Sequence, residues 1–172
     1  MSDLELRLAR LEAIEAIKGL KARYFASCDG KQPAQVRSCF ADGEIDLQYG
    51  RIGNFTRADD MVAVFTELAC AEHIIEMHHA QNPQITVHSA TEASAVWGLY
   101  YYMIDTKQNV ATQLGGGYDD EYRCIDGDWK ITRSCFHQSS TLILDVGEAL
   151  AKVIYAGRTA PAELDDPSRQ AG

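Results

Sequence analysis

The stretch from residue 74 to residue 144 most constrains the fold, because it reads as an almost unbroken succession of β-strands. Asn82-Pro83 and Asp126-Gly127 are typical of tight turns between such strands. Strands joined by short turns pair antiparallel, so the second half of the chain predicts a large antiparallel sheet. The expected strands are Ile74–Gln81, Gln84–Ser89, Ala93–Thr106, Ala111–Ile125 and Asp128–Leu144.

A long helix is predicted ahead of these strands. Apolar residues recur at three- and four-residue spacing from Leu4 to Cys28, after a capping box formed by Ser2 and Glu5, and Gly30 marks the end. We expect this helix to lie across the concave face of the sheet. The residues that it is expected to bury there are Leu8, Leu11, Ile14 and Ile17.

Helices first and strands later give an α+β order, and the length suits one domain. Long curved strands wrapped round helices should leave a pocket between them. We expect the domain to span residues 1–157 and to be followed by a disordered tail at 158–172. The remaining expected elements are short helices at about Ala34–Phe40, Thr56–Ala69 and Val146–Ile154, and a half-buried strand at Glu44–Tyr49.

Composition excludes several classes of partner. The formal charge of −9, from 25 acidic and 16 basic side chains, repels nucleic acid and anionic membrane surfaces. No apolar run approaches the roughly 18 residues of a membrane span. Five cysteines without a C-x-x-C pair or a signal peptide indicate reduced thiols and a cytoplasmic location.

Asp29 and His79 are the first candidates for chemistry. Asp29 stands in the last turn of the long helix, where the helix dipole disfavours a carboxylate, although an exposed Asp-Gly turn residue is the simpler interpretation. His79 follows Ile75 and Met77 at period two and is expected on the apolar face of its strand, with His78 on the other face. A structural core histidine is the alternative.

Two further patterns have a structural and a functional interpretation. Tyr24 and Tyr49 are expected in the core, where their hydroxyls need partners that a pocket ligand could supply. Gly115-Gly116-Gly117 within a strand indicates either a bulge or room for a ligand. No histidines have metal-ligand spacing, and no nucleotide-binding motif occurs, so neither a metal nor a cofactor is expected.

The order of these pieces resembles a known family. A first helix ends in Asp, a short helix reads V-R-S-C-F-A-D, a strand ends in Tyr, and the closing hairpin reads G-G-Y-D-D-E-Y-R-C-I-D-G-D-W-K-I. From about Leu4 to Leu144 the chain is similar to the SnoaL-like branch of the NTF2-like superfamily. That branch includes scytalone dehydratase, bile-acid 7α-dehydratase and hexachlorocyclohexane dehydrochlorinase. The resemblance implies a cone-shaped, curved antiparallel sheet wrapped round N-terminal helices.

The resemblance also implies site residues. The Asp–His dyad of the family falls on Asp29 and His79, and two active-site tyrosines fall on Tyr24 and Tyr49. Two family positions differ, since Gly115 replaces a second histidine and Ser134 replaces a late arginine. The expected substrate-binding residues are Asp105, Leu47, Phe65, Met77 and Trp97.

The sequence therefore predicts a cofactor-independent dehydratase-type lyase. His79, oriented by Asp29, would remove a proton next to a carbonyl of a small apolar cyclic substrate, of the steroid or aromatic kind, and a leaving group would depart. Three alternatives stay open: a ketosteroid-isomerase-like enzyme, the non-catalytic β subunit of an aromatic-ring dioxygenase, and a ligand-binding or scaffold protein. Self-association is expected, with a homotrimer favoured over a dimer, because residues 93–106 alternate apolar side chains on both sheet faces.

Overall fold

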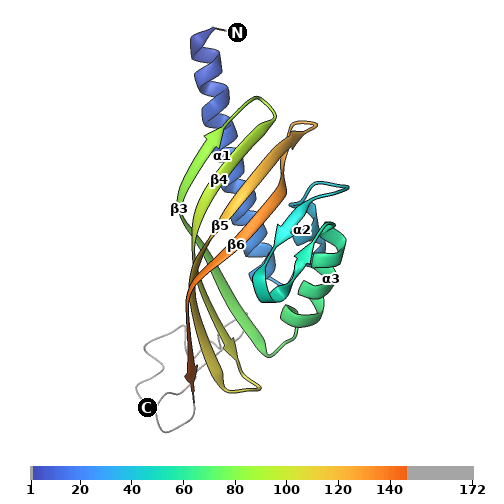
Figure 1. The fold of residues 1–172 in the computed structure, drawn as a ribbon, viewed down its shortest axis with the longest axis vertical. Helices are drawn as coiled ribbons and strands as arrows, with labels where there is room; N and C mark the ends of the chain where they lie inside the picture. The colour runs from blue at the N-terminus through green and yellow to red at the C-terminus, as the bar shows by residue number, and fades with distance from the viewer. Residues whose placement is uncertain (1, 147–172) are drawn as a thin grey trace, which may run out of the picture.

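The structure is a computed structural model that describes residues 2–146 (Figure 1). Helices come first and long strands follow, as the sequence predicts. The expected helix at 146–154 and the tail at 158–172 fall outside the described residues, apart from Val146, so the predicted domain limits stay a prediction. The elements are α1 (Asp3–Asp29), α2 (Pro33–Ser38), β1 (Asp46–Gln48), the 3-10 helix η1 (Gly50–Ile52), β2 (Asn54–Phe55), α3 (Ala58–Ala69), β3 (Ile74–Val87), β4 (Glu92–Asp105), β5 (Val110–Ile125) and β6 (Asp128–Asp145).

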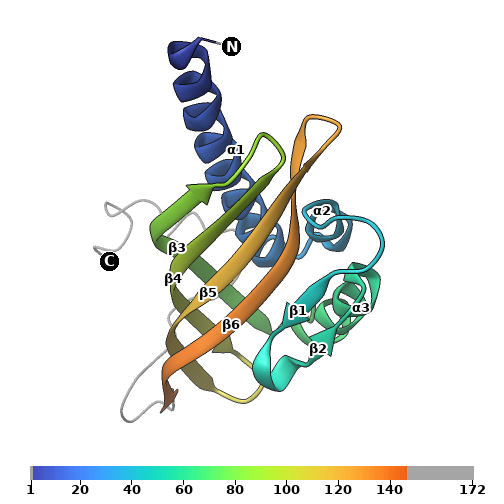
Figure 2. The same ribbon diagram turned by 45° about the horizontal axis from the view of Figure 1, so that its top comes forward.

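One six-stranded sheet in the order β2-β1-β6-β5-β4-β3 confirms the α+β class. The four long strands pair antiparallel, and the short β1 lies parallel to β6. Asp126 and Gly127 have φ values of 51° and 89°, which a tight hairpin turn requires, and they join β5 to β6 as predicted. The sheet is strongly curved, and the helices lie on its concave side (Figures 1 and 2).

The turn predicted at Asn82-Pro83 is wrong. β3 runs without interruption from Ile74 to Val87, and the pairing with β4 shifts register between Gln81 and Gln84. Asn82, at φ 50°, belongs to this bulge. A proline is tolerated at such a place because β3 is an edge strand, where the missing N–H interrupts little pairing. The bulge bends the strand instead of ending it.

The three consecutive glycines of β5 mark close backbone approach. A Cβ on Gly116 would lie 2.4 Å from the carbonyl oxygen of His137, and one on Gly117 would lie 2.7 Å from that of Trp97. The pairing with β6 shifts register between Gly115 and Gly116. The bulge interpretation therefore accounts for these glycines, which let the sheet bend where both neighbouring strands crowd β5.

Helix α1 begins with the predicted capping box and ends at Asp29. Its second half packs on the sheet, where Ile17 and Leu20 are fully buried. Its first turns extend past the sheet (Figures 1 and 2). Leu8 and Leu11 are therefore 54% and 60% exposed, and the expectation that they are buried is wrong. The helix is longer than the surface available to cover it.

A buried ion pair ties α1 to the middle of the sheet. The Lys21 ammonium donates a hydrogen bond to Asp120 Oδ2 on β5 at 2.7 Å, and both side chains are fully buried. Asp120 also accepts hydrogen bonds from the hydroxyls of Tyr122 and Ser134, each at 2.7 Å. The carboxylate is thus surrounded by three donors, which offsets much of the penalty for burying it.

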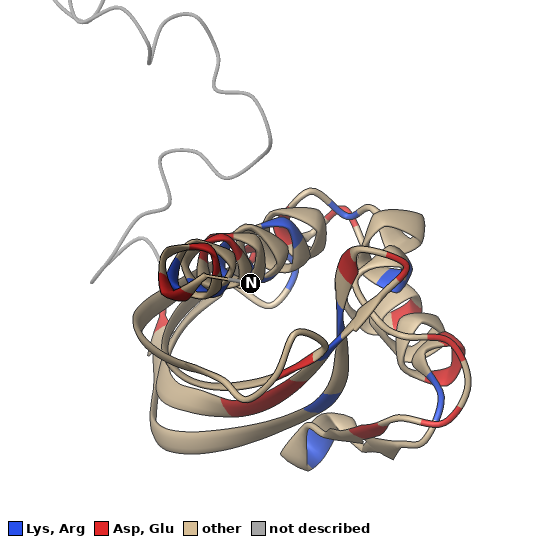
Figure 3. Ribbon diagram, turned by 90° about the horizontal axis from the view of Figure 1, so that it is seen from above, with Lys and Arg blue, Asp and Glu red and all other residues tan. Residues whose placement is uncertain are grey.

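The outer face of the sheet is weakly charged where β3 and β4 form it, whereas β5 and β6 carry charged side chains such as Asp119 and Glu121 there. Met77, Val96 and Tyr100 are 40–50% exposed on it. Residues 77–87 of β3 and 93–104 of β4 contain no Lys, Arg, Asp or Glu, and long parts of the sheet are uncharged in Figure 3. In the part of the chain that the structure describes, no helix is long and apolar enough to cross a membrane. No disulfide joins the five cysteines, all of which lie within the described residues.

Two glycine substitutions test the origin of the sheet curvature. We expect Gly116→Ala to destabilise the fold by about 1–3 kcal/mol, because the new methyl group collides with a neighbouring backbone. Gly19→Ala is the matched control: its Cβ finds ordinary space in the middle of α1 and should stabilise by up to about 1 kcal/mol. Urea unfolding of both variants measures the difference. Equal stabilities would contradict the backbone-crowding argument.

Candidate active site

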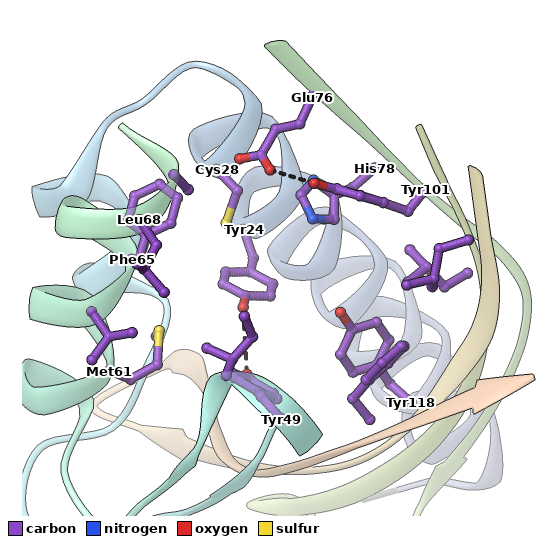
Figure 4. Close-up of a pocket in the computed structure, with 16 residues that line it drawn as sticks. Tyr24, Cys28, Tyr49, Met61, Phe65, Leu68, Glu76, His78, Tyr101 and Tyr118 are labelled. Carbon is purple, nitrogen blue, oxygen red and sulfur yellow. Dashed lines mark hydrogen bonds between the residues drawn. The ribbon is translucent and has the colours of Figure 1, made fainter. Parts of the chain in front are cut away.

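A cavity of about 250 Å³ opens between the C-terminal half of α1, helix α3 and the concave face of the sheet (Figure 4). Its wall is mostly apolar, with aromatic rings from several elements. Three kinds of polar group interrupt that wall: tyrosine hydroxyls, one imidazole and one carboxylate. The lining residues are Tyr24, Cys28, Tyr49, Ile52, Met61, Val64, Phe65, Leu68, Ala69, Glu76, His78, Leu99, Tyr101, Leu114, Tyr118 and Phe136.

Asp29 binds His78 by both backbone and side chain. Its Oδ1 lies 2.6 Å from His78 Nδ1, and its two oxygens accept hydrogen bonds from the His78 backbone N–H at 3.2 and 3.1 Å. The side chains are 25% and 15% exposed. Because a carboxylate accepts, Nδ1 carries the proton, and in the neutral ring Nε2 keeps its lone pair. The end of α1 thereby fixes both the strand and the tautomer of the ring.

The imidazole of His78 is held by rings on two sides. Phe25 stacks on it at 5.0 Å between ring centroids, and Tyr101 approaches at 4.7 Å with a tilt of 58°. Nε2 has no hydrogen-bond partner among the described residues. The ring lines the cavity (Figure 4). A fixed imidazole with a free basic nitrogen at an apolar cavity is suited to accept a proton from a bound molecule.

The sequence assigned this position to His79, and the assignment is wrong in its geometry. His79 is exposed on the outer face of β3, where its ring stacks on Tyr100 at 6.2 Å, and it forms no hydrogen bond with Asp29. Ile75 and Met77 share that outer face. The apolar alternation of β3 therefore marks the convex side of the sheet, and the polar residues face the cavity.

Tyr24 and Tyr49 both reach the cavity. The Tyr24 hydroxyl donates to that of Tyr49 at 3.4 Å, and burial raises the pKa of both phenols. Five residues separate Tyr24 from Asp29, which places them about 140° apart on a regular helix. The helix does not unwind to bring both into the cavity. Asp29 instead reaches sideways to β3 and acts there on His78, which faces the cavity.

The expected substrate-binding residues are divided between cavity, core and surface. Phe65 lines the cavity. Leu47 is fully buried in the core, and Trp97 donates to the Tyr122 hydroxyl behind the cavity wall. Met77 is half exposed on the outer face. Asp105 accepts hydrogen bonds from the backbone N–H groups of 107 and 108, so it caps a turn; these four residues do not line the cavity.

Besides His78 and Tyr101, three polar residues of the wall were absent from the sequence prediction. Glu76 accepts a hydrogen bond from the Tyr101 hydroxyl at 2.8 Å and pairs with Lys31 at 2.5 Å, with both charged side chains 6% exposed. Cys28 lines the cavity, but burial raises the pKa of its thiol, so it stays protonated. Tyr118 is the third. Glu76 could have been found from the sequence, because side chains two residues apart on a strand share a face, and this places Glu76 on the same face as His78.

No group of three or more His, Cys, Asp or Glu side chains within residues 2–146 is arranged to hold a metal ion. The described wall presents one oriented imidazole and several phenols, which are groups suited to acid–base chemistry. A proton can move between Nε2 of His78 and a ligand, and the phenols can hydrogen-bond an oxygen that gains charge.

Comparison with known proteins gives consistent matches. The sequence profile of the SnoaL-like domain family matches residues 9–134. A proposed scytalone dehydratase from Novosphingobium aromaticivorans is 23% identical, with a TM-score of 0.72 over 88% of this chain and 98% of that one. Hexachlorocyclohexane dehydrochlorinase LinA type 3 from Novosphingobium barchaimii is 18% identical, with a TM-score of 0.73 over 86% and 98%. At these identities the structural likeness concerns the fold.

The buried tyrosine hydroxyls limit the stability of the fold at alkaline pH. Burial raises the pKa of Tyr24, Tyr118 and Tyr122 well above the ordinary 10.0, and it also raises those of Tyr49 and Tyr101. A phenol with a raised pKa contributes stability that is complete below pH 10 and is lost as the pH rises toward the folded-state pKa. We expect the free energy of unfolding to fall steeply above about pH 10.

The pKa shift of Lys21 has the opposite effect on the pH dependence of stability. Burial lowers its pKa, with Asp120 opposing the shift, so this group alone would make the protein more stable as the pH rises toward 10.5. We expect the five phenols together to outweigh the single lysine. Denaturant melts at stepped pH, with tyrosinate absorbance recorded in parallel, check the balance. Stability that holds or grows beyond pH 10 would contradict the predicted burial of these hydroxyls.

Proposed function

Because the chain belongs to the SnoaL-like domain family, we propose that it is a cofactor-independent dehydratase-type lyase whose base is His78. The observation that carries the proposal is the contact of Asp29 with both Nδ1 and the backbone N–H of His78, which leaves Nε2 free at the cavity. The comparisons support dehydratase-type activity in general. The dyad and the substrate are our inference.

Proton abstraction is the first step of the proposed reaction. Nε2 of His78 takes a proton from a carbon next to a carbonyl group, and the electron pair of that C–H bond moves toward the carbonyl to form an enolate. Asp29 stabilises the imidazolium that results. General-base catalysis of this kind contributes about 10²–10⁴-fold. The negative end of the α1 dipole repels the Asp29 carboxylate, and the positive charge of the imidazolium offsets this repulsion.

Expulsion of the leaving group completes the elimination. The enolate re-forms the carbonyl, a carbon–carbon double bond forms, and the β-substituent departs with a proton returned by the imidazolium. Tyr49 lines the cavity, accepts a hydrogen bond from Tyr24 and also hydrogen-bonds Ser134, so it supports the developing oxygen charge as part of this group of hydroxyls. The reaction releases water when the leaving group is a hydroxyl, and it needs no redox partner.

A small, neutral, ring-containing substrate fits the cavity. Glu76 pairs with Lys31 and His78 with Asp29, so the described wall presents no unpaired charge to a ligand. About 250 Å³ is below the roughly 300–1,000 Å³ typical of drug-sized ligands, which favours one or two rings over a steroid. The names of the similar proteins, scytalone dehydratase and hexachlorocyclohexane dehydrochlorinase, are in keeping with ring compounds.

The adjacent histidines provide a matched test of the base. His78→Ala should lower turnover by about 10²–10⁴-fold, whereas His79→Ala, on the outer face, should change it less than twofold. The assay screens cyclic β-hydroxy ketones in D₂O. Absorbance follows the conjugated enone, and NMR follows deuterium uptake next to the carbonyl. Exchange or isomer formation without loss of water would identify the isomerase alternative.

Asp29→Asn separates orientation from packing. The amide keeps the size of the side chain but cannot stabilise an imidazolium, so the rate should fall by orders of magnitude with little change in melting temperature. Equal activity in the wild type and in both the Asp29 and His78 variants would overturn the proposed base. Co-purification of the chain with a large Rieske-type protein, without turnover, would instead favour the dioxygenase-subunit alternative.

We also propose self-association through the apolar outer face, with a trimer favoured by the family resemblance. Val96 is 48% exposed in the uncharged strip of β4, and water contact there is unfavourable. Light scattering should give a multiple of 19.0 kDa, and Val96→Lys should shift the protein toward a monomer. Ile125→Lys, at the β5–β6 turn, is the control. A clean monomer at micromolar concentration would contradict the proposal.

A further inference from the structure

Tyr118 on β5 carries a hydroxyl without a partner. The side chain is 8% exposed and lines the cavity, yet its hydroxyl forms no hydrogen bond with any described residue. The other phenols of the wall are engaged: Tyr101 donates to Glu76, and Tyr24 donates to Tyr49. Figure 4 shows the Tyr118 hydroxyl directed into the cavity.

A phenylalanine would fill the same space without this polar atom. Within residues 2–146, no fully buried side-chain nitrogen or oxygen lacks a partner. The Tyr118 hydroxyl has no partner among these residues and is therefore not fully buried, so it can form hydrogen bonds only with a molecule that enters the cavity. A donor placed in this way on an otherwise apolar wall is how pockets fix the orientation of a ligand.

A cation lies behind the ring of Tyr118. The Lys21 ammonium is 3.9 Å from the ring centroid, in the range of a cation–π contact, and Asp120 holds it there. A cation over the ring withdraws electron density from it and makes the O–H a stronger donor. Burial raises the pKa of Tyr118, so the phenol stays protonated and donates without losing its proton.

Tyr118 and His78 lie at neighbouring places on the wall. Both pack against Phe25, with ring centroids 5.7 and 5.0 Å from its own. Tyr49 contacts Tyr118 edge to face at 6.2 Å. Phe25 is buried behind both rings and does not itself line the cavity, so one ligand in the cavity can present a C–H group to His78 and an oxygen to Tyr118.

We propose that Tyr118, whose ring contacts the Lys21 ammonium, is the main hydrogen-bond donor to the substrate carbonyl oxygen and to the enolate formed from it. This inference rests on the proposed function for its catalytic meaning, but it defines a subsite for neutral or anionic oxygen that can be measured by binding alone. During proton abstraction the C–H proton goes to Nε2 of His78, and Tyr118 keeps its own proton while stabilising the oxygen charge.

Binding of 4-nitrophenolate tests the subsite, with 4-nitrotoluene as the matched ligand that lacks the oxyanion. Tyr118→Phe should weaken 4-nitrophenolate binding by about tenfold to hundredfold, the usual value of a hydrogen bond to a charged group. The affinity for 4-nitrotoluene should stay within twofold. The variant should fold, because no hydrogen bond within the described chain is lost. Tyr100→Phe, on the outer face, is the control and should change neither affinity.

Unchanged 4-nitrophenolate affinity in Tyr118→Phe would overturn the proposal, and so would an equal loss for both ligands, which indicates packing. Failure of the wild type to bind 4-nitrophenolate at millimolar concentration would also overturn it. Calorimetry gives both affinities. The base is judged separately by deuterium uptake in His78→Ala, so a failed subsite and a failed base give different results.

Discussion

The buried pair of Lys21 and Asp120 is the contact on which the arrangement of the site depends. It joins the middle of α1 to the middle of β5, and both charges are fully removed from water. Loss of either partner would leave the other charge uncompensated, at a cost of about 3–5 kcal/mol. A helix anchored in this way has a fixed height and rotation over the sheet, so Tyr24 reaches the cavity and Asp29 meets the edge strand β3. Because Asp29 binds both the backbone and the ring of His78, packing and chemistry share one contact.

Much of the fold could be predicted because its determinants are local. Caps, helical spacing and the Asp126-Gly127 turn gave α1 and the β5–β6 hairpin. The Asn82-Pro83 turn was wrong because an edge strand admits a bulge at proline, which local sequence does not distinguish from a hairpin. The exposure of Leu8 was missed because periodicity does not say where the sheet ends.

The site was predicted only in part, because its polar partners are distant in sequence. Tyr24 lines the cavity, and Asp29 ends α1 but binds His78 instead of the expected His79; their catalytic roles stay predictions. The choice of His79 over His78 assumed that the apolar face of β3 points inward. The alternation of side chains along a strand separates its two faces but does not show which face is buried. Here the inward face is polar because Glu76 finds partners that are distant in the sequence, Lys31 just after α1 and Tyr101 on β4. No local pattern reveals these contacts.

Charge placement around the cavity limits the chemistry further. The two lysines nearest the wall are each bound to a carboxylate, Lys21 to Asp120 and Lys31 to Glu76, and neither offers a free cation to a ligand. An anionic ligand would meet hydrogen-bond donors but no free counter-charge in the described wall, whereas a neutral ketone would meet a base at one position and a phenol at another. Such a site gains its electrostatic advantage only as charge develops, when the imidazolium forms beside Asp29 and the oxygen becomes negative beside Tyr118. Interactions that strengthen only at that stage accelerate the reaction instead of tightening ground-state binding.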